Sequence, residues 1–231
     1  MQAVILAAGK GTRLLPVTEH IPKALIKVNG TPIIVRILNQ LIDVGVTAVL
    51  IVVHHFGDLI KNKLGNEYQG IKIKYAEQKK LNGDADALRY AERFVTDDKF
   101  LLIYCDSFFK DGHLKKLITH TTDGTLSVCK VSDARRFGVV LHENGIIKQI
   151  IEKSPNPPSN LANTSIHFLP KKIFGACNQL KSENGKEIRV VEAIQLLITQ
   201  GLIFDFEELD TWFDIGTKED LSFAEASGDE K

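Results

Sequence analysis

Short apolar runs alternate with stretches of helical periodicity along the first half of the chain. The apolar runs are residues 3–8, 48–53 and 100–104, and residues 71–76 are a further predicted strand. Between the first two runs, residues 33–42 carry apolar side chains at helical spacing, which predicts a helix. Thr31 can cap the start of this helix and Pro32 fits its first position, whereas Gly45 is a signal for its end. Residues 84–94 form a second helical stretch. Strands that alternate with helices in this way predict βαβ units and a mainly parallel sheet.

The second half of the chain has a different pattern. Two strand-like runs, 138–140 and 146–151, flank turn residues at 142–145, which predicts a hairpin. A proline-rich loop, 155–159, precedes a further strand at 164–169. We expect one domain, 1–231, with a small β insert at about 126–170. The remaining predicted elements are helix 187–199, strand 202–206, helix 218–226 and a frayed tail at 227–231.

Composition and charge narrow the class of protein. The chain has 231 residues, and its 29 basic and 29 acidic side chains give a pI near 7.1, so no net field attracts nucleic acid or an anionic membrane. No apolar run approaches the about 20 residues of a membrane span, and no basic segment precedes residues 3–8 as in a signal peptide. We therefore expect a cytoplasmic protein. Its three cysteines, Cys105, Cys129 and Cys177, are odd in number and far apart, which predicts reduced thiols.

A glycine-containing loop follows the first predicted strand. Residues 6–14 read LAAGKGTRL. In an open α/β sheet such a loop lies at the carboxyl edge of the strands, where ligands bind. Glycines leave backbone N–H groups free to meet phosphate oxygens, and Lys10 and Arg13 add charged donors. The spacing matches neither a Walker A loop nor the dinucleotide-binding motif, because Leu14 stands in place of the third glycine. The segment predicts a phosphate-binding loop; a simple tight turn is the alternative.

The loop is followed by the segment PKAL at 22–25, in which Lys23 supplies a second positive charge. Together, LAAGKGTR (6–13), LP (15–16) and PKAL resemble the signature of the sugar-1-phosphate nucleotidylyltransferases, and similar scattered blocks reach Gly216. The resemblance implies a Rossmann-like three-layer α/β/α fold with a mainly parallel mixed sheet and a sugar-binding β insert, of the nucleotide-diphospho-sugar transferase type. It implies an enzyme that joins a nucleoside triphosphate to a sugar 1-phosphate, forming an NDP-sugar and releasing pyrophosphate.

The resemblance also implies a set of nucleotide-binding residues. They are Ala7, Ala8, Gly9, Gly11, Thr12, Arg13, Gln78 and Gly83. Arg13 would hold the β- and γ-phosphates, and Lys23 would neutralise charge near the α-phosphate. Gln78 matches the base-reading glutamine of the family. An amide presents a donor and an acceptor to a pyrimidine, whereas guanylyl-transferring relatives often carry an acid here, so UTP or dTTP is favoured.

Two aspartates are candidates for metal ligands. Asp106 follows the strand 100–104, and Asp214 lies in the block DTWFDIGT, 210–217. Two carboxylates from different strand ends can share a hard cation such as Mg²⁺, which also bridges substrate phosphates. Both match the metal-binding aspartates of the family. Taken alone, each could instead cap the helix that follows it.

The resemblance assigns the sugar 1-phosphate to the β insert. Glu152 and Lys153 resemble the first two residues of the family's Glu-Lys-Pro motif, in which the glutamate binds sugar hydroxyls and the lysine binds the sugar phosphate; Ser154 replaces the proline. Asn163, Ser165 and Cys105 complete the expected sugar-phosphate site. The expected catalytic residues are Arg13, Lys23, Asp106, Lys153 and Asp214. Because the attacking phosphate oxygen is already anionic, the implied in-line displacement needs no general base.

Three positions depart from the family pattern. Cys105 and Ser165 stand where glycines are usual, and Asp84 stands where a threonine is usual. These changes leave the acceptor open among glucose 1-phosphate, another hexose, an amino sugar, a heptose or phosphocholine. They also motivate the alternative of a catalytically degenerate nucleotide-binding subunit. Cytidylyl or guanylyl transfer to another acceptor stays possible.

Other classes have less support. A dinucleotide-dependent oxidoreductase would need the third loop glycine that Leu14 replaces. No hexapeptide repeat is present, so we expect no acyltransferase module. We expect a monomer or small homo-oligomer that binds neither nucleic acid nor membrane.

Overall fold

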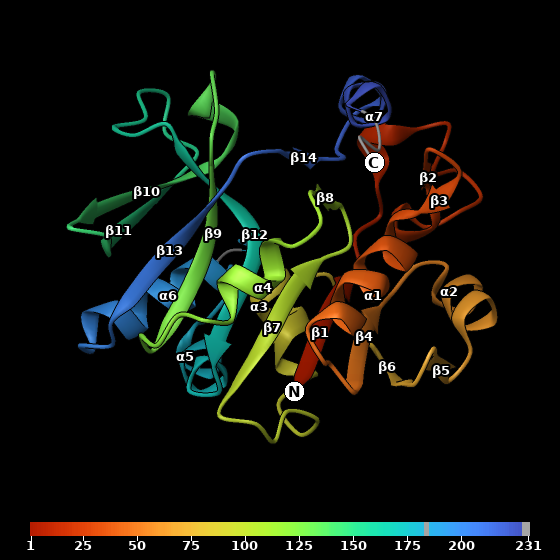
Figure 1. Ribbon diagram of the computed structural model, residues 1–231, viewed down its shortest axis with the longest axis horizontal. Helices are drawn as coiled ribbons and strands as arrows, with labels where there is room; N and C mark the ends of the chain where they lie inside the picture. Colours follow the sequence, from red (N-terminus) through yellow and green to blue (C-terminus); the bar gives the residue numbers. More distant parts are fainter. Residues whose placement is uncertain (183–184, 228–231) are drawn as a thin grey trace.

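A computed structural model describes residues 1–182 and 185–227. Ten strands form one sheet, in the order β10-β11-β13-β9-β12-β7-β1-β4-β6-β5 (Figure 1). The strands are β1 (Gln2–Ala7), β2 (Lys27–Val28), β3 (Thr31–Pro32), β4 (Ala48–Val53), β5 (Glu67–Tyr68), β6 (Ile71–Glu77), β7 (Lys99–Tyr104), β8 (Ser107–Phe109), β9 (Gly124–Lys130), β10 (Gly138–Glu143), β11 (Ile146–Glu152), β12 (Leu161–Pro170), β13 (Phe204–Leu209) and β14 (Trp212–Asp214). The helices are α1 (Ile33–Asp43), α2 (Gly57–Leu64), α3 (Asp84–Arg89), α4 (His113–Leu117), α5 (Ile173–Gln179), α6 (Val190–Thr199) and α7 (Lys218–Ala226), with 3₁₀ turns η1 (Thr12–Leu14), η2 (Lys23–Leu25) and η3 (Ala134–Arg136).

The centre of the sheet is parallel. Strand β1 lies between β4 and β7, parallel to both, and β6 extends the parallel set beyond β4. Strands β1, β4 and β7 are continuous apolar runs, as expected for strands buried on both faces. Strand β6 instead alternates, with Ile71 and Ile73 buried and Lys72 and Lys74 exposed. Strand β12 then pairs antiparallel with β7. The predicted α/β fold with a mixed sheet is therefore confirmed. The prediction that the sheet is mainly parallel is wrong, because six of its ten strand pairings among the described residues are antiparallel.

Helices cover both faces of the sheet. Ala3 and Ile5 of β1 pack into one apolar core with α1, α2 and α4. Val4 and Leu6, the alternate residues of the same strand, pack into a second core with α3, α5 and α6. Because successive side chains of a strand point to opposite faces, one strand contributes to both cores. The sheet is thus the middle of three layers.

The far end of the sheet closes on itself. Strands β9, β12, β10, β11 and β13 follow one another, and the additional β10–β12 pairing at Val139 and Ala162 closes a ring of five strands. In Figure 1 these strands form a separate group beside the parallel part. Four of them fall in the insert that the sequence places at about 126–170. The fifth, β13, comes from residues 204–209 and pairs parallel with β9.

Several predicted boundaries are wrong. Thr31 does not cap α1: it belongs to β3, which pairs with β2, and Pro32 takes the N-cap position. The helix predicted at 84–94 ends at Arg89, because the following bonds, such as Tyr90 N to Ala87 O, close three-residue turns. The helix predicted from 187 begins at Val190, and the strand predicted at 202–206 lies at 204–209. All of the predicted tail except Ser227 lies outside the described residues.

Candidate active site

A cavity of about 490 Å³ opens at the carboxyl ends of β1, β6 and β7. A smaller cavity of about 170 Å³ continues from it toward the five-stranded ring. The two cavities share five lining residues, which are Arg13, Asp84, Tyr104, Asp106 and Arg189. The site therefore has room for two ligands that meet at these residues.

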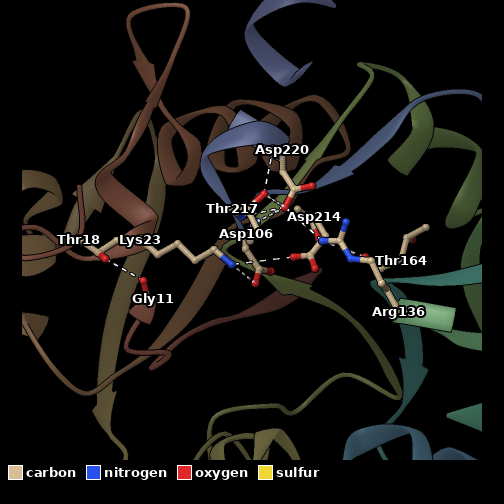
Figure 2. Close-up of polar contacts among 11 residues, drawn as sticks. Gly11, Thr18, Lys23, Asp106, Arg136, Thr164, Asp214, Thr217 and Asp220 are labelled. Carbon is tan, nitrogen blue, oxygen red and sulfur yellow. Dashed lines mark hydrogen bonds and ion pairs between the residues drawn. The ribbon is translucent and has the colours of Figure 1, made fainter. Parts of the chain in front are cut away.

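The glycine loop after β1 forms one wall of the larger cavity. Gly11 has φ +66°, a conformation that favours glycine, and its carbonyl accepts a 2.8 Å hydrogen bond from Thr18 Oγ1 (Figure 2). No atom lies within 4 Å of the position that a Cβ of Gly9 would occupy, so the backbone there is accessible to a ligand. The residues of this loop that line the cavity are Ala8, Gly9, Lys10, Gly11, Thr12 and Arg13. Ala7 ends β1, is buried, and lies outside the lining.

Lys23 points into the centre of the site from the first residue of η2. Its Nζ lies 2.6 Å from Asp106 Oδ2 and 3.9 Å from Asp214 Oδ1 (Figure 2). The Lys23 residue is only 8% exposed. One buried ammonium group thus sits between the two carboxylates that the sequence proposes as metal ligands.

The two aspartates meet because β8 and β14 pair. In this antiparallel pair Asp214 lies opposite Ser107, the residue after Asp106. The Ile215 amide also donates to the Asp106 carbonyl at 2.9 Å. The turn after Asp214 is fixed by Asp220, whose carboxylate accepts from the backbone amides of Gly216 and Thr217 at the start of α7 (Figure 2). A cap on a terminal helix therefore positions a residue at the centre of the site.

The charges of this group are tightly linked. Burial alone would lower the pKa of Lys23, but Asp106 and Asp214 raise it above its ordinary value, so the side chain is a cation. Burial, together with the neighbouring Asp106, raises the pKa of Asp214 to about 6, although Lys23 and Arg13 act in the opposite direction. Two carboxylates share one lysine here, so binding of a cation beside them would be electrostatically favourable.

Gln78 lies directly after β6 and is 2% exposed. Its Nε2 donates to the Gly83 carbonyl at 3.1 Å and to Asp86 Oδ2 at 3.0 Å. Gly83 has φ +106°, and a Cβ at this position would lie 2.1 Å from the Ile188 carbonyl oxygen. Only glycine fits there. Gln78 and Gly83 both line the larger cavity. They follow β6, whereas the glycine loop follows β1.

The residues expected to bind the acceptor line the smaller cavity. Lys153 and Ser165 both have positive φ, +45° and +60°, and Ser165 lies in the irregular part of β12. The conformation of Ser165 explains why glycine is usual at this position in the resembling family. Asn163 is buried, and its Oδ1 has no hydrogen-bond partner among the described residues. This oxygen is an acceptor that the protein itself leaves unsatisfied.

Cys105 lines the larger cavity rather than the acceptor side. Burial and the adjacent Asp106 raise the pKa of its thiol to about 12, so the group is neutral and unsuited to nucleophilic attack. Asp84, the other unusual residue, accepts a 2.7 Å hydrogen bond from the Val190 amide at the start of α6. Burial raises the pKa of Asp84. Burial also raises the pKa of the neighbouring Tyr104, and the nearby Asp84 carboxyl raises it further.

Arg189 is a lining residue that the sequence did not reveal. Its Nη1 donates to Glu152 Oε1 at 2.9 Å, so it links the start of α6 to the last residue of β11. Arg189 falls in the stretch predicted as helix, where a charged side chain is usually on the surface. The helix instead begins one residue later, and Arg189 faces both cavities. Arg136 and Trp212 also line the smaller cavity, although Trp212 was expected in the core and Arg136 was not named.

The predicted phosphate-binding loop lies beside a charged cluster, and a second cavity is joined to the first. This arrangement is typical of an α/β protein that brings a nucleotide together with another ligand. The family model described as Nucleotidyl transferase matches residues 2–230 of the chain. The chain belongs to this family and is a nucleotidyltransferase. The match confirms the predicted family and excludes the oxidoreductase alternative.

Similar proteins agree with this assignment. The chain is 38% identical to the UTP--glucose-1-phosphate uridylyltransferase AglF of Haloferax volcanii, over 97% of this chain and 95% of the relative. It is 36% identical to the bifunctional protein GlmU of Methanococcus aeolicus over 96% of its own length, but it spans only 53% of that relative. The crystal structure of a putative glucose-1-phosphate thymidylyltransferase from Bacillus anthracis superposes with a TM-score of 0.90 at 27% identity, covering 100% of this chain and 96% of the other. Within the described residues no helix is both long enough and apolar enough to cross a bilayer.

Proposed function

We propose that the chain transfers a uridylyl or thymidylyl group from UTP or dTTP to a sugar 1-phosphate and releases pyrophosphate. The observation that carries this proposal is the junction of the two cavities at Arg13 and Asp106, beside Lys23. The base-reading Gln78 lies in one cavity and Lys153 in the other. A nucleotide and a phosphorylated acceptor that occupy the two cavities would bring their phosphates together at the charged cluster.

The reaction is a direct in-line displacement. An anionic oxygen of the acceptor's phosphate attacks the α-phosphorus and forms a new P–O bond. The bond from the α-phosphorus to the oxygen that bridges to the β-phosphate breaks, and pyrophosphate leaves with that electron pair. Lys23, held as a cation, neutralises charge at the α-phosphate, Arg13 holds the leaving phosphates, and Lys153 holds the acceptor phosphate. No proton has to be removed from the nucleophile, so the residues act by position and charge.

The site is suited to Mg²⁺. The Asp106 and Asp214 carboxylates provide hard oxygen ligands on one side of the cluster. Burial and the neighbouring Asp106 raise the pKa of Asp214, so a bound cation would stabilise its charged form. The described residues contain no group of three or more His, Cys, Asp or Glu side chains placed to hold a metal. Waters and phosphate oxygens would therefore complete the coordination. When bound, the ion would neutralise charge on the phosphates during the transfer.

Glucose 1-phosphate is the acceptor we propose first. The AglF and Bacillus anthracis proteins are both named for glucose 1-phosphate. Glu152 and Arg189, paired at 2.9 Å, provide acceptors and donors for sugar hydroxyls, and Lys153 Nζ lies 4.0 Å from Glu152 Oε1. Phosphocholine, whose ammonium head carries no hydroxyl, would leave this pair without a partner.

Pyrophosphate release with Mg²⁺ tests the proposal. UTP, dTTP, CTP, ATP and GTP are each combined with a panel of sugar 1-phosphates and phosphocholine. We expect the highest kcat/KM for UTP or dTTP with glucose 1-phosphate. Nucleotide binding without pyrophosphate release for any pair would contradict the proposal and support the degenerate subunit.

A further inference from the structure

The carboxamide of Gln78 has a fixed orientation. Its nitrogen donates to two oxygen atoms, the Gly83 carbonyl at 3.1 Å and Asp86 Oδ2 at 3.0 Å. A backbone carbonyl and a carboxylate accept hydrogen bonds but cannot donate them. Turning the amide by 180° would place Gln78 Oε1 against both oxygens, which repel it. The two partners therefore decide which end of the amide faces the protein.

The other end of the amide is left for a ligand. No described residue donates a hydrogen bond to Gln78 Oε1, and Gln78 lines the nucleotide cavity. Within this cavity Gln78 thus offers an acceptor. The Gln78 amide therefore presents its oxygen, and not its nitrogen, to a ligand in this cavity.

Asp86 is itself held in place. It lies in the first turn of α3, where the positive end of the helix favours a carboxylate. Arg89, one turn further along, lies 3.7 Å from the other oxygen, Asp86 Oδ1. The Asp86 side chain is 16% exposed. A helix start and an arginine thus keep one carboxylate oxygen pointed at Gln78.

We propose that Asp86 sets the base selectivity by orienting Gln78 Oε1 toward the base. An acceptor at this point favours a base with a ring N–H, as in uracil and thymine. Cytosine presents an unprotonated ring nitrogen at the same place, so two acceptors would face each other. This inference rests on the proposed function and names the residue that chooses between UTP and CTP. Asp86 acts through Gln78 and is a positioning residue.

The test uses the Asp86→Asn variant. Asparagine can donate as well as accept, so its side chain no longer requires the Gln78 nitrogen, and only the Gly83 carbonyl still favours the original orientation of the amide. We expect the UTP-to-CTP ratio of kcat/KM, at saturating glucose 1-phosphate, to fall at least about tenfold, the equivalent of one hydrogen bond. The KM for the acceptor should not change. Asp58→Asn is the matched control, because Asp58 lies in the first turn of α2 with Lys61 one turn further at 3.0 Å, outside the lining of both cavities.

A second measurement needs no variant. Calorimetry compares binding of UTP and of 3-methyl-UTP, which lacks the ring N–H, to the wild-type protein. We expect about tenfold weaker binding of the methylated nucleotide. An unchanged UTP-to-CTP ratio in a folded Asp86→Asn variant, or equal binding of the two nucleotides, overturns the inference. If the protein still binds UTP more tightly than 3-methyl-UTP but releases no pyrophosphate, the proposed transferase function is wrong and the role of Asp86 stands.

Discussion

Replacement of Asp214 by asparagine should separate stability from activity. The pKa of about 6 for this carboxyl, against an ordinary 3.8, results from burial and from Asp106. A raised carboxyl pKa means that the folded protein is destabilised at any pH where the group is charged. The difference of about 2 pH units corresponds to at most about 3 kcal/mol at pH 8, and this cost disappears as the pH falls from 6 toward 4.

Without metal, Asp214→Asn should therefore be more stable than the wild type at pH 8. For a chain of this size a gain of about 3 kcal/mol corresponds to a melting temperature higher by about 6–12 °C. Under the proposed function the same variant should lose about a thousandfold in kcat/KM, because an uncharged amide replaces one of the two carboxylates beside the phosphates and binds Mg²⁺ more weakly. Millimolar Mg²⁺ should raise the melting temperature of the wild type more than that of the variant.

The assay is thermal unfolding in EDTA and in Mg²⁺ at pH 8 and pH 5, together with pyrophosphate release. Asp210→Asn is the control, because Asp210 is exposed and only four positions away. A variant that melts below the wild type at pH 8 in EDTA would refute the electrostatic reasoning. A variant with near-normal turnover would refute the metal assignment.

Three further changes test other parts of the site. Arg189→Ala should raise the acceptor KM about tenfold and the nucleotide KM by less, since it removes a charged donor and the 2.9 Å ion pair of Glu152. Arg189→Lys should restore part of the loss. Lys186→Ala, at an exposed neighbouring position, should change neither KM. Gly83→Ala should weaken nucleotide binding in calorimetry at least about tenfold, because the new Cβ would lie 2.1 Å from the Ile188 carbonyl oxygen; unchanged affinity would disprove the close contact. Burial lowers the pKa of His167 to about 3, below the 6.5 of an unfolded chain, so its contribution to stability is lost as the pH falls below 6.5. Between pH 6.5 and pH 4.5 the free energy of unfolding in urea should fall by about 2 kcal/mol less in His167→Asn than in the wild type. An equal fall in both proteins would contradict this.

Much of the parallel sheet could be predicted from the sequence. Strands β1, β4 and β7 are buried on both faces, so they appear as continuous apolar runs. The short helices α2, α4 and α5 gave too few turns of periodicity to be seen. The ring of strands could not be inferred either, since β13 pairs with residues of β9 that lie 80 positions earlier in the chain.

The site was predicted in a similar way. The glycine loop, Gln78, Asp106 and Asp214 were named from local motifs and from the family resemblance, and the structure brings them to one sheet edge. Arg189 was not named, because nothing in its neighbours along the chain distinguishes it from a surface residue. Its significance depends on Glu152, which lies 37 positions away.

The sequence by itself determined the local features: which runs are buried strands, where the backbone needs glycine, and which family the motifs resemble. These features depend on residues a few positions apart, and hydrophobic period and backbone sterics act over that range. The tertiary structure alone decided that Lys23 lies between two aspartates, that the pKa of Asp214 is raised, and that the Gln78 amide faces the cavity with its oxygen. Each depends on distances between segments that only folding brings together, and electrostatic interactions and hydrogen bonds are set by those distances.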